Sequence, residues 1–332
     1  MLRRLSALPI DTFLLAMAAT VALAAVLPAR GAFADAMSVA AKVVIALLFA
    51  LYGARLSPQQ AWHGVKQWQL HLLVLATTFV VFPVLGLAAR GLVPWLLNID
   101  LYHGLLFLCL VPSTVQSSIA FTSIARGNVS AALVSASLSN ILGVALTPLL
   151  VVLLMNTSGV TRMDATAIRD IVLQLVLPFT VGQLLRPRVG EWLARHAILT
   201  SVVDRGSILL IVYTAFSIGI VEHIWRSVDP WQLVAVAVID TALLVVVLIF
   251  TWLIGRLSGF DRGDSIVLLF CGSKKSLASG LPMALVFFPA ATVGVIMLPL
   301  MIFHQIQLVV CSLIASRLSR DAPPAEAPAA AA

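Results

Sequence analysis

Long hydrophobic segments alternate along the chain with short polar stretches that hold most of its arginines. Most of these segments reach or approach the length of about 20 apolar residues that an α-helix needs to cross a bilayer. The pattern predicts an all-α membrane protein with ten transmembrane helices, whose ends it fixes only to within several residues. The ten segments cover about residues 11–27, 36–54, 70–89, 101–125, 129–155, 168–185, 207–221, 231–255, 265–288 and 290–315.

The composition supports this prediction. Of the 332 residues, 61% are hydrophobic and only 11% are charged, and the mean hydropathy is +1.06. A soluble fold does not need so much apolar surface, so the chain is interpreted as a polytopic helical membrane protein. The cysteines Cys109, Cys271 and Cys311 all lie in apolar runs and are interpreted as buried free thiols. No metal site or cofactor motif is predicted.

The net charge of +7 is spread over short loops, which disfavours nucleic acid as a partner and favours a bias across a lipid bilayer. Of the 21 basic residues, 13 fall on the side that holds the amino terminus and 5 on the other. The remaining three are Lys42, near a helix end, and the pair Lys274 and Lys275. Basic loops face the cytoplasm, so both termini are predicted to be cytoplasmic.

The two ends of the chain carry further predictions. Arg3 and Arg4, the first apolar run and the Ala-x-Ala pattern at 32–34 also fit a cleaved signal peptide, which would leave nine helices and upset the charge bias. The tail at 321–332 is rich in alanine and proline and is predicted to be disordered. The remainder, 1–320, is predicted to form one transporter-like domain.

The ninth segment contains an unusual polar stretch, FCGSKKSLASGLPMA, at residues 270–284. Insertion of a lysine at the centre of a membrane helix costs roughly 2.5 kcal/mol or more. Gly272, Gly280 and Pro282 are poor helix formers, so the segment is predicted to break here and to line a buried polar site. The alternative is that Lys274 and Lys275 snorkel from a helix end to the membrane surface.

Polar residues interrupt other segments as well. The fourth breaks at Pro112, and the hydroxyls and amide that follow would supply ligand groups, although small hydroxyl residues also tighten helix packing. In the fifth, Ser135 and Ser139 share a helical face with Asn140 close by. Asp240, in the eighth, should be protonated or paired with one of the two lysines. The candidate substrate- or ion-binding residues are Ser113, Thr114, Gln116, Ser117, Ser118, Ser135, Ser139, Asn140, Asp240, Ser273, Lys274, Lys275, Ser276, Ser279, His304 and Gln305.

The two halves of the chain resemble each other weakly. Residues 105–118 and 267–280 both run from an apolar approach through a cysteine to a small polar break. Gly143 and Pro148 recur in order as Gly294 and Pro299. Five helices per half would place the second copy, at about 168–317, inverted relative to the first, at about 11–155. Inverted repeats with a broken helix in each half are typical of secondary transporters.

Two other classes of function stay open at this point. Lys275 and Ser279 are four residues apart, the spacing that an intramembrane Ser–Lys hydrolase would need. A membrane scaffold or regulatory subunit is the second alternative, and the polar breaks in both halves argue against it.

Several stretches carry a family resemblance. PSTVQSSIAFTSIARGNVSAAL at 112–133 and CGSKKSLASGLPMA at 271–284 resemble the bile acid:sodium symporter superfamily, in particular the branch with vertebrate sodium/bile acid cotransporter 7 and its bacterial relatives. LYGARLS at 51–57 and WQLHLLVLATTFVVFPVLG at 68–86 fit too. The resemblance implies a core domain of helices three to five and eight to ten and a panel domain of helices one, two, six and seven. It also implies ion and substrate sites where the fourth and ninth helices cross. We expect the protein to lie in the bacterial inner membrane.

The sequence departs from the family pattern at the sodium ligands. Ser273 stands at the position of the family's acidic residue and Leu277 at that of its glutamine. Ile119 replaces an asparagine, and Thr78 a third-helix glutamine. Two fifth-helix hydroxyl ligands fall on Ala132 and Ala136. The resemblance therefore does not carry sodium coupling to this chain.

We expect a symporter-like secondary transporter that works by alternating access and moves an organic anion. The coupling ion is left open between sodium and protons. Lys274 or Lys275 would either release a proton during the cycle or remain charged as the counter-ion of the substrate.

Overall fold

The computed structural model describes residues 12–55, 67–155, 169, 172–223 and 229–321, and the secondary structure of these residues is helical throughout. The predicted signal peptide begins outside the described residues, and the predicted tail lies outside them except for Asp321. The elements are α1 (Thr12–Val26), α2 (Ala32–Arg55), α4 (Trp68–Ala76), η3 (Thr77–Val81), α5 (Phe82–Ala88), η4 (Ala89–Leu92), α6 (Ile99–Leu110), α7 (Gln116–Ile124), α8 (Val129–Met155), η6 (Val172–Val176), α10 (Leu177–Arg195), α11 (Ala197–Val221), α12 (Pro230–Leu257), α13 (Arg262–Gly272), α14 (Leu277–Phe287), α15 (Ala290–Ile296) and α16 (Leu298–Arg320).

Within the described residues, six helical stretches are long and apolar enough to cross a membrane by themselves. Two of the remaining predicted segments are each split into halves of 9 to 12 residues, α6 with α7 and α13 with α14, and neither half reaches the length of a bilayer. The six stretches are Ala32–Arg55, Trp68–Leu92, Val129–Met155, Ile198–Val221, Pro230–Leu257 and Ala290–Arg320.

The breaks occur in the two segments where the sequence predicts them, but the second one differs in detail. It covers only residues 273–276, and both Gly280 and Pro282 lie inside α14. The proline ring removes the donor that would bond the carbonyl of Ala278 four residues earlier. In its place the Tyr52 hydroxyl donates to the Ala278 carbonyl oxygen at 3.4 Å. Helix α14 therefore continues through a proline that was expected to interrupt it.

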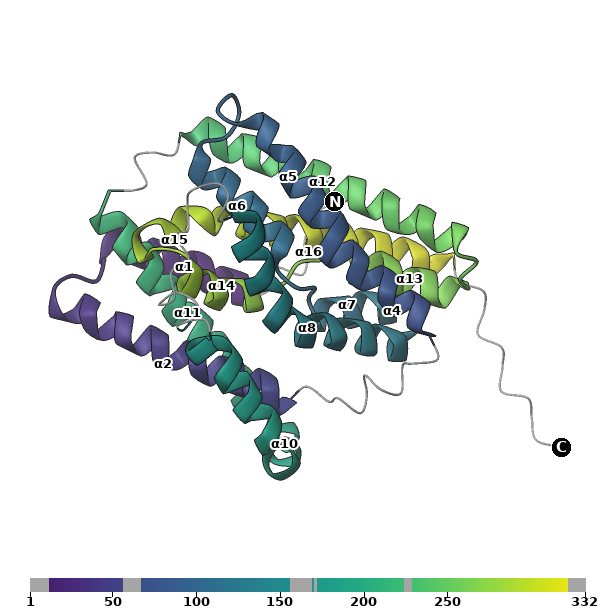
Figure 1. The fold of residues 1–332 in the computed structure, drawn as a ribbon, viewed down its shortest axis with the longest axis horizontal. Helices are drawn as coiled ribbons and strands as arrows, with labels where there is room; N and C mark the ends of the chain where they lie inside the picture. The colour runs from purple at the N-terminus through teal and green to yellow at the C-terminus, as the bar shows by residue number, and fades with distance from the viewer. Residues whose placement is uncertain (1–11, 56–66, 156–168, 170–171, 224–228, 322–332) are drawn as a thin grey trace, which may run out of the picture.

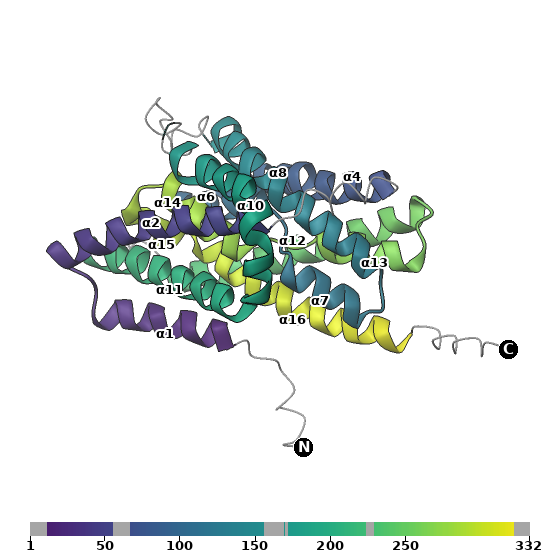
Figure 2. The same ribbon diagram turned by 90° about the horizontal axis from the view of Figure 1, so that it is seen from below.

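The helices pack in two groups (Figures 1 and 2). The lateral group consists of α1, α2, η6, α10 and α11, and α2 packs along α10 over much of its length. The crossing group consists of α4 to α8 and α12 to α16 and contains both breaks. The two groups meet mainly where α11 packs against α14 and α15.

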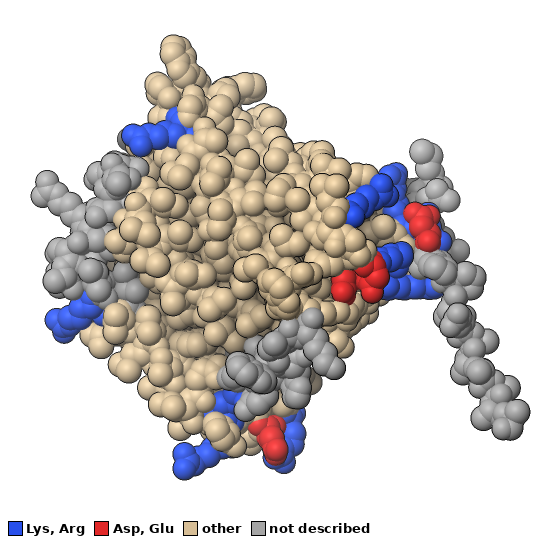
Figure 3. Space-filling model, turned by 45° about the vertical axis from the view of Figure 1, so that its right-hand side comes forward, with Lys and Arg blue, Asp and Glu red and all other residues tan. Residues whose placement is uncertain are grey.

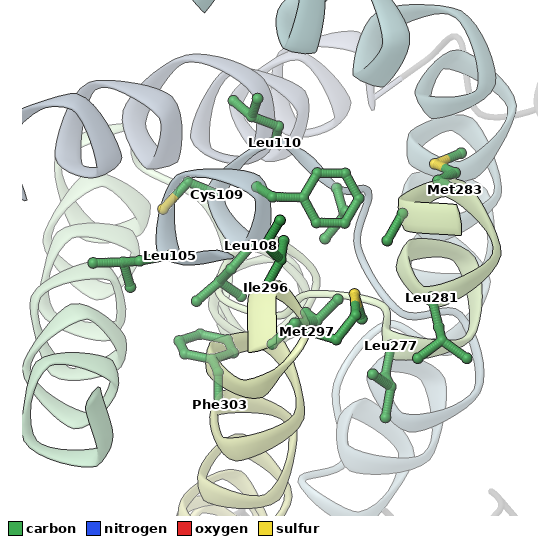
Figure 4. Close-up of a cluster of buried hydrophobic side chains, with 14 of the residues drawn as sticks. Leu105, Leu108, Cys109, Leu110, Leu277, Leu281, Met283, Ile296, Met297 and Phe303 are labelled. Carbon is green, nitrogen blue, oxygen red and sulfur yellow. The ribbon is translucent and has the colours of Figure 1, made fainter. Parts of the chain in front are cut away.

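The buried apolar centre of the crossing group forms where side chains of α6, α14, α15 and α16 converge (Figure 4). Burial of a large apolar side chain contributes about 1.5–3 kcal/mol relative to exposure in water. The labelled members are Leu105, Leu108, Cys109, Leu110, Leu277, Leu281, Met283, Ile296, Met297 and Phe303, each at most 2% exposed.

The outer surface agrees with a membrane environment. Figure 3 shows a broad face without lysine, arginine, aspartate or glutamate, and the charged side chains gather at its margins. Helix α12 shows the same pattern along its length, since Val238, Ile249 and Trp252 are exposed while Val236 and Val247 are buried. A solvent of lipid chains favours this outward apolar surface.

Two glycines allow the close approach of α2 and α10. A Cβ added at Gly53 would collide with the carbonyl of Phe179, and one added at Gly182 would collide with the carbonyl of Ala50. Helices in membranes pack closely through such small residues because lipid supplies no hydrophobic force between them.

Substitution of alanine at Gly182 should therefore destabilise the protein by about 1–3 kcal/mol, because the added methyl group meets backbone rather than a flexible side chain. Gly206 in α11 is the matched control, since a Cβ there meets nothing within 4 Å. Gly206→Ala should stabilise by roughly 0.5–1 kcal/mol through helix propensity. Thermal unfolding in detergent measures both changes, and equal effects of the two substitutions would contradict the proposed packing.

Candidate functional site

The two breaks lie against each other and are joined by hydrogen bonds between residues far apart in sequence. The Ser113 hydroxyl donates to the carbonyl oxygen of Cys271 at 2.6 Å. The backbone N–H of Ser276 donates to the carbonyl oxygen of Pro112 at 2.8 Å. The Ser118 hydroxyl donates to the carbonyl oxygen of Phe270 at 3.3 Å. Each break thus supplies groups that satisfy backbone atoms of the other.

Helix α8 satisfies further carbonyls at the end of α6. Thr147 donates to the carbonyl oxygen of Leu110 at 2.9 Å, and the Asn140 amide donates to that of Ser113 at 2.8 Å. Ser139 accepts from the Ser113 N–H at 3.0 Å. Backbone groups without a partner are costly in an apolar environment, so these side chains make the break tolerable.

Gln307 of α16 supports the second break. Its side-chain oxygen accepts from the Lys275 N–H at 2.9 Å, and its amide nitrogen donates to the Lys275 carbonyl oxygen at 2.9 Å. The same amide nitrogen lies 2.8 Å from Nδ1 of His304. Ser273, the residue that follows α13, donates its hydroxyl to the carbonyl oxygen of Leu269 at 2.5 Å. Gln307 is fully buried, but the candidate residues chosen from the sequence include Gln305, two residues earlier, and not Gln307.

Both lysines are completely buried, so the alternative in which they snorkel to the surface is wrong. The ammonium nitrogen of Lys275 donates to the carbonyl oxygens of Thr78, Cys109 and Val111 at 2.9, 2.8 and 2.9 Å. It also lies 4.1 Å from the centre of the Phe82 ring.

Lys274 has a different environment although it is adjacent. Its ammonium nitrogen lies 3.9 Å from the centre of the Phe121 ring and 5.4 Å from that of Phe270. Among the described residues this nitrogen has no hydrogen-bond partner. The side chains of Cys271 and Cys311 are among its neighbours.

Asp240 was predicted to be either protonated or paired with one of these lysines, and the pairing is not found in the structure. Asp240 is fully buried, neither carboxyl oxygen has a side-chain partner among the described residues, and the backbone of Phe303 in α16 lies beside the carboxyl group. Its helix, α12, packs against α13 and α16. The three donors of the Lys275 ammonium are already taken by carbonyl oxygens, so that lysine does not need a carboxylate.

A cavity of about 320 Å³ lies between the lateral group and the crossing group. Its polar wall comes from both broken helices and from α8 and α16, and includes seven of the candidate residues. Phe13, Phe49, Phe179 and Ile208 of the lateral group contribute an apolar wall. The seven are Thr114, Gln116, Ser117, Asn140, Ser276, Ser279 and His304.

The other nine candidates lie outside the lining of this cavity. Ser135 is buried in contact with Nδ1 of His71 at 2.8 Å, and Ser139 is buried against the fourth-helix break. Gln305 is only partly buried on α16. The nine are Ser113, Ser118, Ser135, Ser139, Asp240, Ser273, Lys274, Lys275 and Gln305.

The charged residues of the cavity lie on the lateral group and were not among the candidates. Arg55 of α2 forms an ion pair with Asp204 of α11 at 2.8 Å. Arg205 of α11 stacks over the ring of Phe13 at 5.5 Å. All three charged side chains line the cavity. In the sequence Arg55 and Arg205 lie near predicted helix ends and were counted only toward orientation, and Asp204 is next to Arg205. Their place in the cavity was therefore not predicted.

The geometry does not support the hydrolase alternative. The Ser279 hydroxyl donates to the Asn140 side-chain oxygen at 3.0 Å, and the Lys275 ammonium is directed to the three backbone carbonyls. A nucleophilic serine needs its base within hydrogen-bond reach.

The sequence is similar to that of known membrane transporters. The family model of the SBF-like CPA transporter family matches residues 11–320. The chain is 50% identical to the uncharacterized protein PA2026 of Pseudomonas aeruginosa over 93% of both chains. It is 46% identical over 94% of both chains to YfeH of Escherichia coli, which is provisionally named a symporter. Sodium/bile acid cotransporter 7 of Rattus norvegicus is 27% identical over 82% of this chain and 81% of its own.

Gln307→Leu should destabilise the protein by about 1–3 kcal/mol, because both backbone groups of Lys275 lose their partner in a buried position. Gln305→Leu is the matched control on the same helix and should change stability by less than about 0.5 kcal/mol. Melting temperatures of the purified variants provide the comparison. A Gln305 variant as unstable as the Gln307 variant would show that Gln307 does not have this supporting role.

Proposed function

This chain belongs to the SBF-like CPA transporter family, within the bile acid:sodium symporter superfamily, and we propose that it is a secondary active transporter for a compact organic anion. The family and those of its relatives with a functional name are transporters and not enzymes. The observation that carries the proposal is the cavity between the two helix groups, where polar groups of both breaks face apolar walls. Ligand sites of transporters lie at such helix breaks.

The charge and size of the cavity favour the substrate class. Arg55 and Arg205 face it together with one carboxylate, Asp204, which leaves one positive charge in excess among these side chains. Its volume of about 320 Å³ lies at the lower end of the range of about 300–1,000 Å³ for ligand pockets. Apolar walls and a polar end suit a small amphipathic anion.

The architecture we propose has ten membrane-spanning helices in two inverted five-helix repeats. The paired breaks of α6–α7 and α13–α14 support this, because each occupies the fourth position of its half. The division into a crossing group and a lateral group supports the expected core of helices three to five and eight to ten and the expected panel of the other four. Relative movement of the two groups would open the cavity to alternate sides of the membrane.

We place the protein in the bacterial inner membrane with both termini in the cytoplasm. Glu191, near the end of α10, has a side chain that is 91% exposed, and Arg30, between α1 and α2, is exposed on the opposite side in this topology. A membrane-impermeant thiol reagent should label Glu191→Cys only after permeabilisation and Arg30→Cys in intact cells. The native cysteines are buried and should contribute little background. The reverse labelling pattern would overturn the proposed orientation.

Ligand binding should not require sodium. Ser273 and Thr78 stand at positions where the family has sodium ligands. Their hydroxyls instead donate to the carbonyl oxygens of Leu269 and Val74 at 2.5 and 2.8 Å. We expect a thermal-shift screen of organic acids, bile salts and phosphorylated lipids to find a stabilising compact anion. The shift should be the same in sodium, potassium and choline salts at constant ionic strength.

Two outcomes of this screen decide between proposals. A saturable, sodium-specific shift would show that the chain has a sodium site and would refute sodium independence. If no anion stabilises the protein in any salt and liposome flux is also absent, the scaffold alternative replaces transport.

For proton coupling, Lys274 is the better candidate of the two lysines, because its ammonium has no acceptor among the described residues. The groups that face it are the two aromatic rings of α7 and α13 and the thiols of Cys271 and Cys311. Lys274→Gln should fold and insert but lose the pH dependence of transport between about pH 6 and 8. Normal transport across this range in the variant would assign Lys274 a structural role only.

A further inference from the structure

The three carbonyl oxygens around the Lys275 ammonium form a cradle that consists entirely of backbone atoms, those of Thr78, Cys109 and Val111. No carboxylate is among the contacts of this ammonium within the described residues. The face of the Phe82 ring closes another side at 4.1 Å. Lysine carries three N–H donors, and the cradle offers one acceptor to each of them.

The backbone geometry explains why the carbonyl of Thr78 is available. In η3 the N–H of Phe82 bonds the carbonyl of Thr77, five residues back, rather than that of Thr78. The next residue, Pro83, has no N–H to offer in this register. A π-helical turn followed by proline therefore leaves the Thr78 carbonyl without a helical donor.

The other two carbonyls belong to the end of α6. The N–H of Ser113, which would bond Cys109 in a continuing helix, instead donates to Ser139. Val111 lies in the break itself, so its carbonyl has no helical partner. The cradle thus joins three carbonyls that two separate interruptions of helical bonding, the π-helical turn before Pro83 and the end of α6, release toward one point.

Neutral carbonyl oxygens and an aromatic face are the ligands of a weakly hydrated monovalent cation. We propose that this cradle is a monovalent-cation site whose permanent occupant is the ammonium of Lys275. The tethered cation holds η3, the end of α6 and the second break together, and no ion from solution is needed to close the crossing. The inference does not depend on the substrate or on the transport activity proposed above.

A vacated cradle should accept a cation from solution. Ammonium matches the present occupant in chemistry, and potassium is close to ammonium in size. Gln307 would still hold the backbone of residue 275 through both of its polar groups, so the break can keep its shape in a Lys275→Ala variant.

The experiment compares three variants with the parent protein, first in choline chloride and then with ammonium, potassium or sodium chloride at constant ionic strength. Lys275→Ala should melt at a lower temperature in choline and recover saturably, by about 3 °C or more, in ammonium or potassium. Lys275→Met fills the space without a charge and should not respond. Lys274→Ala is the matched control, since it removes an equally buried lysine that has no carbonyl cradle.

If Lys275→Ala responds to ammonium and potassium no more than Lys274→Ala and the parent protein do, the proposal is wrong. It is also wrong if Lys275→Ala is as stable as the parent in choline. If the alanine variant cannot be purified in choline, recovery of a monodisperse protein in ammonium but not choline supports the site. Failure in every salt, while Lys274→Ala is recovered, counts against it.

Discussion

The structure depends on one constraint, which is that a membrane helix can be interrupted only where other groups satisfy its released backbone atoms. The end of α6 shows this most completely, since the carbonyls from Cys109 to Ser113 each accept a hydrogen bond from elsewhere. The donors come from the break between α13 and α14 and from α8. These hydrogen bonds hold the two breaks together. The cavity lies beside them, and its polar wall is formed by other polar side chains at the same two breaks.

The positions of the helices and of the breaks are largely encoded in local sequence. The apolar run at 129–155 coincides with α8, and Pro112 marks the first break. The second break was less well predicted, because Gly280 and Pro282 serve α14 rather than interrupt it. A Cβ at Gly280 would lie 2.5 Å from Cδ2 of Leu300 and 3.1 Å from Cγ1 of Val111, so a larger residue there would require these side chains to shift.

The roles of the polar residues could not be read in the same way. Types and spacing identify a polar site, but tertiary packing decides which side chains face the cavity and which satisfy backbone. Lys274 and Lys275 are neighbours in sequence, yet one meets two aromatic rings and the other three carbonyls. Asp240 was expected beside them only because opposite charges in a membrane usually pair. The charges of the cavity come from α2 and α11, whose sequences give no sign of a site.

The hydrogen bonds also indicate where movement is easiest. Inside the crossing group the bonds between the breaks are as short as 2.6 Å and include an ammonium, and bonds to charged groups are roughly twice as strong as neutral ones. Across the boundary with the lateral group, the Tyr52 hydroxyl reaches the Ala278 carbonyl at 3.4 Å, which is near the limit of a hydrogen bond. The carbonyl concerned is the one that Pro282 releases, so its loss does not unravel α14. Sliding of the lateral group past α14, as the proposed transport cycle requires, would therefore disrupt this weak polar contact. Separation of the two breaks would expose a row of carbonyls and an ammonium to a medium that solvates neither.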